Sequence, residues 1–133
     1  MIANVARPTP LATYAWDQDT KNRVMATVPH VALATADAYA AASVTILPPA
    51  GAFEVVTPWI GGVAAVAHGI YGASQVFSDS YDRSALMTAR GCGHLITAAG
   101  FATLAFGLGA YALPIIAIGE TTRIAATLVG RER

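Results

Sequence analysis

The stretch His68-Gly-Ile-Tyr-Gly72-Ala-Ser-Gln75-Val-Phe-Ser-Asp79-Ser-Tyr81 closes a long apolar run and decides how the chain is interpreted. If the run is helical, about 100° per residue places Gly72 and Asp79 within about 40° of His68. Toward the amino terminus the same stripe carries only small residues, Gly61, Ala64 and Ala65. Such a stripe predicts a helix that lets a flat group or another backbone approach the histidine, and an ionisable residue within an apolar helix points to function.

The composition indicates a membrane protein. The 133 residues are 55% hydrophobic and 12% charged, whereas a soluble globular domain carries about 25% charged residues. Eight basic and eight acidic residues cancel without forming a long run, so a nucleic-acid surface is not expected. Cys92 is the only cysteine, which excludes an internal disulfide and a multi-cysteine metal site within the chain.

Apolar segments at about 24–47, 55–77 and 95–118 predict an all-α membrane protein with three transmembrane helices. At about 1.5 Å per residue, a segment of this length extends about 36 Å, enough to cross a hydrocarbon core of about 30 Å. Residues 78–93 are expected to form the polar turn between the second and third spans.

The chain is expected to be one membrane-anchor domain, 1–133. An interfacial segment, 1–23, is expected to precede a helical bundle over 24–119, and a tail, 120–133, to follow it. Three spans would place the first segment and the 78–93 turn on one side of the membrane. That side has the larger number of basic residues: Arg7, Lys21, Arg23, Arg83 and Arg90, against Arg123, Arg131 and Arg133. The difference predicts an amino terminus on the inside.

Asp37 would lie near mid-depth in the first span, so we expect its carboxyl group to face protein or water. His30 shares its face but is about 10 Å away along the axis, and could be either a near-surface residue or a polar packing contact. His94 is expected at the interface, at the start of the third span. His68 would then lie deeper than His94, which makes the two a poor pair for one haem.

His68 and Asp79 each allow two interpretations. His68 could bond to a neighbouring helix backbone or offer a ring nitrogen to haem iron. Asp79 could be a solvated residue at a helix end, or it could lie beside a cofactor at the membrane boundary, about 16 Å along the axis from His68.

The pattern His68-x3-Gly72-x6-Asp79, with Gln75-Val76 and Ser78 between them, resembles the small D-type membrane anchor of succinate dehydrogenase, respiratory complex II. In that family the run is His-x3-Gly, often Gln-Val, then Thr-Asp-Tyr at the inner end of the second of three membrane helices. The sequence motif itself is shared over residues 68–81. Over residues 16–119 the resemblance is limited to the arrangement of the segments along the chain.

The resemblance implies that His68 supplies one axial ligand to the iron of haem b, the other coming from the larger C-type anchor. It implies that Asp79 lies beside the ubiquinone site. The family's next residue is a quinone-contacting tyrosine; here that position is Ser80, and Tyr81 follows one residue later. Arg23 is a candidate partner for a haem propionate from its position alone.

The resemblance therefore implies a subunit that is not catalytic alone, in a complex that transfers electrons from succinate to ubiquinone. Its partners would be the C-type anchor, the iron–sulfur subunit, the flavoprotein and the lipid bilayer, in a mitochondrial inner membrane or a bacterial plasma membrane. A second class of function is a structural hydrophobic subunit of a membrane, pilus or virion assembly without cofactor. A third is a small channel or holin lined by Asp37 and His30.

Overall fold

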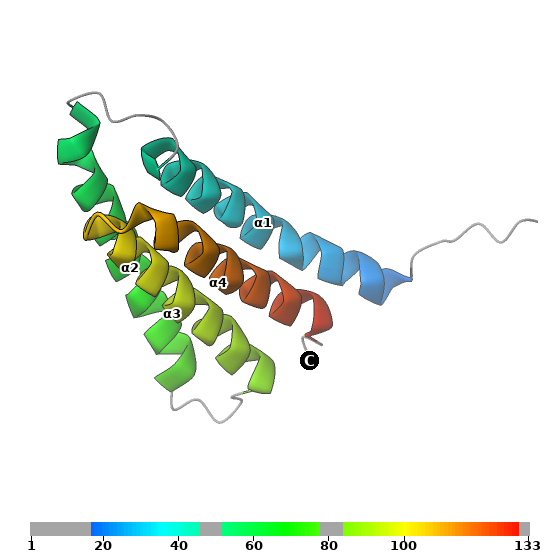
Figure 1. Cartoon of the computed structure of the whole chain (residues 1–133). Helices are drawn as coiled ribbons and strands as arrows, with labels where there is room; N and C mark the ends of the chain where they lie inside the picture. Colours follow the sequence, from blue (N-terminus) through cyan, green and yellow to red (C-terminus); the bar gives the residue numbers. More distant parts are fainter. Residues whose placement is uncertain (1–16, 46–51, 78–83, 131–133) are drawn as a thin grey trace, which may run out of the picture.

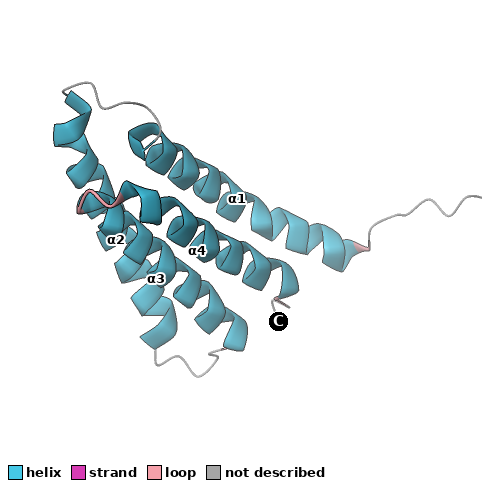
Figure 2. Ribbon diagram, in the orientation of Figure 1, coloured by secondary structure: helices cyan, strands magenta, loops and turns pink. Residues whose placement is uncertain are grey.

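The structure, a computed structural model, describes residues 17–45, 52–77 and 84–130, with side chains from Thr57 onward in the middle segment. All regular structure in these residues is α-helical (Figure 2), as expected from the apolar segments. The helices are α1 (Gln18–Thr45), α2 (Ala52–Phe77), α3 (Ala85–Ala105) and α4 (Gly109–Val129). The first two helices overlap the predicted segments 24–47 and 55–77. The third predicted segment, 95–118, does not correspond to one helix.

The predicted continuous helix 95–118 is wrong, because the chain turns at residues 106–108. Gly107 has φ of 78°, the left-handed conformation that glycine adopts without steric cost. Its amide donates to the carbonyl of Leu104 at 3.0 Å, and the amide of Leu108 donates to that of Thr103 at 2.9 Å. This pair of bonds is a Schellman motif, which ends α3 and lets α4 fold back along it.

The third helix also begins earlier than expected. Ser84 caps α3, since its side chain accepts a 3.1 Å hydrogen bond from the amide of Met87. The predicted polar turn 78–93 is therefore helical from Ala85 onward, while 78–83 lie outside the described residues. Residues 120–129 of the predicted tail 120–133 belong to α4, which continues to Val129.

The first helix begins at Gln18, inside the segment 1–23 that was expected to be interfacial. Asp17 precedes it and accepts a 2.7 Å hydrogen bond from the amide of Thr20. This bond satisfies one of the free amides of the first turn and lowers the pKa of the Asp17 carboxyl group. Residues 1–16 lie outside the described part of the chain.

Helices α2, α3 and α4 pack in sequence order, and α1 lies along α4 while barely contacting α2 (Figure 1). The small-residue stripe of α2 packs on α3. A Cβ atom at Gly72 would come within 2.8 Å of the Gly91 carbonyl oxygen, and one at Gly61 within 2.8 Å of the Ala105 amide nitrogen. The stripe thus admits another backbone, one of the two possibilities that its composition left open.

The bundle has a polar interior and an apolar exterior. Its buried apolar core is small: Ala41, Phe101, Leu104, Ala112 and Ile116. Large apolar side chains point outward instead, with Trp59 73% exposed, Ile70 69% and Phe106 82%. Soluble domains show the opposite arrangement.

Among the described residues, only Gly109–Val129 combines the length and the hydropathy needed to cross a membrane. The prediction of three transmembrane helices is therefore not confirmed. The first two predicted spans form helices, but α1 also carries charged and polar residues such as Asp19, Lys21 and Arg23.

Candidate functional site

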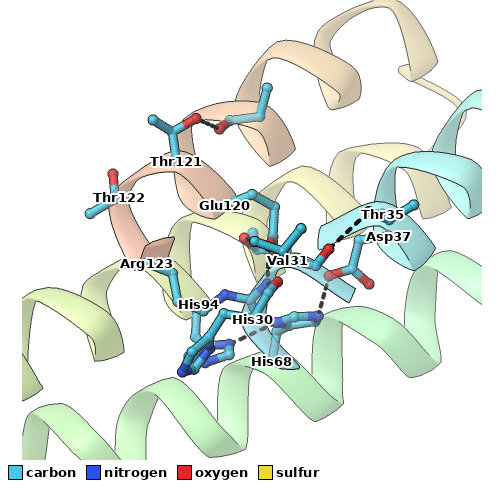
Figure 3. A network of polar contacts seen from close by, with 12 residues as sticks. His30, Val31, Thr35, Asp37, His68, His94, Glu120, Thr121, Thr122 and Arg123 are labelled. Carbon is cyan, nitrogen blue, oxygen red and sulfur yellow. Dashed lines mark hydrogen bonds and ion pairs between the residues drawn. The ribbon is translucent and has the colours of Figure 1, made fainter. Parts of the chain in front are cut away.

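His68 lies in the interior of the bundle with both ring nitrogens against protein atoms (Figure 3). Its Nδ1 atom is 2.9 Å from Nδ1 of His94 on α3. Its Nε2 atom is 3.2 Å from a carboxylate oxygen of Asp37 on α1. The histidine therefore joins three helices, and its partners are side chains rather than a helix backbone. Asp37 is buried and faces protein, one of the two surroundings that we expected for its carboxyl group.

His94 is buried in the middle of α3, with 3% of its surface exposed. The expectation of an interfacial His94 at a shallower depth than His68 is wrong, because α3 starts at Ala85 and carries His94 nearly three turns into the bundle. The edge of Tyr71 packs on the imidazole ring, with centroids 4.7 Å apart. The two histidines contact each other directly and do not face one another across a gap.

A second buried polar group lies on α4 beside the histidines (Figure 3). The guanidinium of Arg123, which is fully buried, forms an ion pair with Glu120 one turn earlier and donates a 3.2 Å hydrogen bond to the carbonyl of His30 on α1. The hydroxyl of Thr97 donates to the other oxygen of Glu120 at 3.0 Å. These bonds link α1, α3 and α4 and pair the Glu120 carboxylate with the Arg123 guanidinium, whose Nε and Nη1 atoms have no hydrogen-bond partner among the described residues.

Asp37, His68 and Glu120 could each offer one ligand atom to a metal ion, and these atoms lie within 4.8 Å of one another. However, both oxygens of Glu120 are already engaged, by Thr97 and by Arg123. A cationic guanidinium in contact with a ligand oxygen opposes a second cation there. The group therefore fits an internal ion-pair network better than a metal centre.

A groove of about 360 Å³ opens beside the histidines, between α1 and α2, which hardly touch. Its walls are mainly apolar and are formed by Pro29, His30, Leu33, Ala67, His68, Tyr71 and His94. The half-buried His30 is one of the residues that line the groove, and its backbone carbonyl accepts the hydrogen bond from Arg123. A groove of this size and lining can hold a small apolar molecule.

His68 does not fit the haem-ligand role in this arrangement. A ligating imidazole directs one ring nitrogen to the metal and donates from the other. Both ring nitrogens of His68 face Asp37 and His94, so neither is directed to the groove. Ligation by His68 would require the contact with Asp37 or the one with His94 to break.

The other predicted site residues are not brought together by the described structure. Asp79, Ser80 and Tyr81, which were predicted to contact quinone, lie outside the described residues. Arg23, the candidate propionate partner, forms an ion pair with Asp19 one turn earlier on α1.

Glu120 and Arg123 were not predicted as site residues, because the sequence placed them at the end of the third predicted membrane helix. A signal was present: the segment after Arg123 returns to Ile-Ala-Ala-Thr-Leu-Val, so the charged pair is flanked by apolar residues on both sides. Such a pair, spaced at i and i+3, is typical of internal pairing on one helix face.

Comparisons with protein-family models, with curated proteins and with solved structures found no match to this chain. Inference about function therefore depends on its own residues and their geometry.

Proposed function

We propose that this chain is a membrane-anchor subunit of a succinate:quinone oxidoreductase, embedded in the bilayer through an all-helical bundle. In this proposal it carries haem b jointly with a C-type anchor, contributes to a ubiquinone site and docks the iron–sulfur and flavoprotein subunits. It is not an enzyme by itself.

The main support for the proposal is the distribution of side chains in the bundle: polar groups lie inside, around the histidines, and large apolar groups lie outside. The charged and imidazole groups Asp37, His68, His94 and Arg123 are at least nine-tenths buried, whereas large apolar side chains point outward. In a bilayer this arrangement keeps the polar groups away from lipid and places apolar surface against lipid or partner helices. A buried imidazole cluster beside an apolar groove is also the setting that a haem-carrying bundle requires.

The motif His68-x3-Gly72-x6-Asp79 supports the assignment of the complex by resemblance alone, since both ring nitrogens of His68 face Asp37 and His94 in the described structure. Ubiquinone is lipid-soluble and succinate is not, so electrons from the soluble subunits must reach a pocket at the membrane boundary. We place that pocket near Asp79, with Ser80 or Tyr81 as the quinone-contacting residue.

Purification of the tagged full chain from its native membrane in mild detergent tests this proposal. We expect a flavoprotein, an iron–sulfur protein and a second small membrane subunit to copurify, with b-type haem absorbance. A tagged unrelated membrane protein of similar size from the same membrane is the control. Many copies of this chain alone, without visible absorbance, would support the structural-subunit alternative and reject the anchor.

A further inference from the structure

Each of the four described helices contributes a buried titratable or charged side chain to one interior network (Figure 3). Asp37 comes from α1, His68 from α2 and His94 from α3, while α4 provides Glu120 and Arg123. None of these five residues is more than 7% exposed. One atom from each of Asp37, His68 and Glu120 lies within 4.8 Å of the other two, so a charge on any of them acts on the others.

The charges in this network do not balance. Within the described residues, Asp37 and Glu120 are the acidic side chains that are buried, and Arg123 is the only buried lysine or arginine. With neutral imidazole rings the network therefore carries one net negative charge. A buried charge without a counter-charge is strongly unfavourable, and such a group takes up a proton instead. One additional proton makes the network neutral.

The hydrogen bonds of Glu120 identify it as the ionised carboxyl group. One of its oxygens accepts from the Thr97 hydroxyl at 3.0 Å, and the other accepts from the Arg123 guanidinium. Two donors, one of them cationic, stabilise a carboxylate. By contrast, Oδ2 of Asp37 accepts no hydrogen bond from the described residues and lies 3.2 Å from Nε2 of His68. The uncompensated charge is therefore that of Asp37.

His94 does not compete for the additional proton. Its Nδ1 atom lies 2.9 Å from Nδ1 of His68, so the two rings share one hydrogen at this contact. The positive charge of Arg123 acts on His94 from the neighbouring helix and opposes a second cation on that ring. The additional proton therefore belongs to Asp37 and His68.

The groove gives this pair access to solvent. His68 and His30 are among its lining residues, and its volume of about 360 Å³ is many times what one water molecule needs. Water in the groove can carry a proton to or from His68. The titratable and charged groups around the pair are His30 on α1, His94 on α3, and Glu120 and Arg123 on α4.

We propose that Asp37 and His68 together bind one exchangeable proton at neutral pH, which enters and leaves through the groove. The proton lies either on the Asp37 carboxyl group beside a neutral imidazole, or on His68 as an imidazolium beside a carboxylate. The network is neutral in both forms, so the proton is a property of the pair. The inference goes beyond the proposed function and does not depend on the identity of the complex.

The test is denaturant unfolding of the full chain in detergent micelles between about pH 7.5 and about pH 9, where aspartate and histidine of the unfolded chain have lost their protons. The folded chain then binds one proton more than the unfolded chain, so raising the pH lowers its stability. We expect the unfolding equilibrium constant to rise by up to about tenfold for each pH unit.

Asp37→Asn removes the charge imbalance, so its unfolding constant should not change with pH in this range. Asp19→Asn removes an exposed carboxyl group from the same helix; it is the matched control and should keep the wild-type dependence. Glu120→Gln leaves Arg123 to balance Asp37, so it should lose the pH dependence as well. This second variant keeps the test decisive if Asp37→Asn does not fold, as judged by circular dichroism.

Spectroscopy of the wild-type chain at about pH 7.5 locates the proton directly. We expect either an infrared band of a protonated carboxyl group that disappears in Asp37→Asn, or a doubly protonated ring in ¹⁵N-histidine magnetic resonance that disappears in His68→Gln. An ionised Asp37 beside a neutral His68 would overturn the inference. So would unfolding constants that change alike with pH in the wild type and in Asp37→Asn. The copurification experiment tests the anchor function separately from either result.

Discussion

Gly93 on α3 and Gly119 on α4 lie in direct backbone contact. A Cβ atom added to Gly93 would come within 2.8 Å of the Gly119 carbonyl oxygen, and one added to Gly119 within 2.7 Å of the Gly93 carbonyl oxygen. This contact lies one turn from Arg123, whose amide nitrogen would be 2.9 Å from the same Gly93 Cβ. The close approach of the two backbones therefore positions the buried ion pair beside His94.

Gly93→Ala should destabilise the bundle by about 1–3 kcal/mol, because rigid helix backbone occupies the space that the methyl group needs. The measurement is unfolding in mixed micelles followed by circular dichroism. Gly62→Ala is the matched control, since no atom lies within 4 Å of its Cβ position. It should be neutral or stabilising by up to about 1 kcal/mol, because alanine favours the helix. Equal effects of the two substitutions would contradict the helix contact.

Arg123→Met should destabilise the fold by about 3–5 kcal/mol, because it leaves the Glu120 carboxylate buried without its partner. The double variant Arg123→Met, Glu120→Gln should recover most of the loss. Arg23→Met removes the ion pair with Asp19 from a partly exposed site, so it should cost no more than about 1 kcal/mol. Denaturant unfolding in detergent of the wild-type chain, these three variants and Glu120→Gln measures these differences. A double variant whose loss of stability equals the sum of the two single losses would argue against coupling.

Val66→Lys should impair membrane integration, because Val66 is 61% exposed near the middle of α2. A lysine at the centre of a membrane helix costs about 2.5–3.5 kcal/mol on insertion scales. Gln18→Lys, at the exposed start of α1, is the control and should integrate normally. Glycosylation-site mapping in microsomes reports the integrated fraction. Unchanged integration of Val66→Lys would indicate that this face of α2 does not meet lipid.

Asp79→Asn should lower quinone reduction by the assembled complex at least about tenfold, if its carboxyl group takes part in proton transfer at the quinone. Succinate oxidation with a water-soluble electron acceptor should stay unchanged, which separates the quinone step from assembly. Gln75→Asn, four residues earlier in the sequence and near the end of α2, is a control for local packing. Wild-type turnover and an unchanged Michaelis constant for quinone would remove Asp79 from the site.

Much of the fold followed from local patterns. The apolar runs predicted the first two helices, and the stripe through Gly61 and Gly72 predicted the close approach of another helix. The position of Asp37 within an apolar run predicted a protein or water partner, and in the structure its carboxylate lies 3.2 Å from His68. These conclusions depend on helical periodicity, composition and the cost of burying charge, which act within one segment of the chain.

The residues Phe106-Gly-Leu-Gly109 gave a signal for the turn at Gly107. They lie inside a run without charged residues, from which we predicted one continuous membrane helix. A length criterion for membrane helices does not detect a turn whose backbone bonds are satisfied by a Schellman motif. Because α3 begins at Ala85 and not near residue 95, His94 lies well inside the helix, where it contacts His68.

By itself, the sequence determined an all-helical chain with an apolar surface and a histidine framed by small residues on its second helix. Only the tertiary structure decided that His68 lies between Asp37 and His94, and that Arg123 is buried against Glu120 and the carbonyl of His30. The physical reason is that helix periodicity sets which residues share a face. Which faces meet, and at what height, depends on packing between residues far apart in the chain.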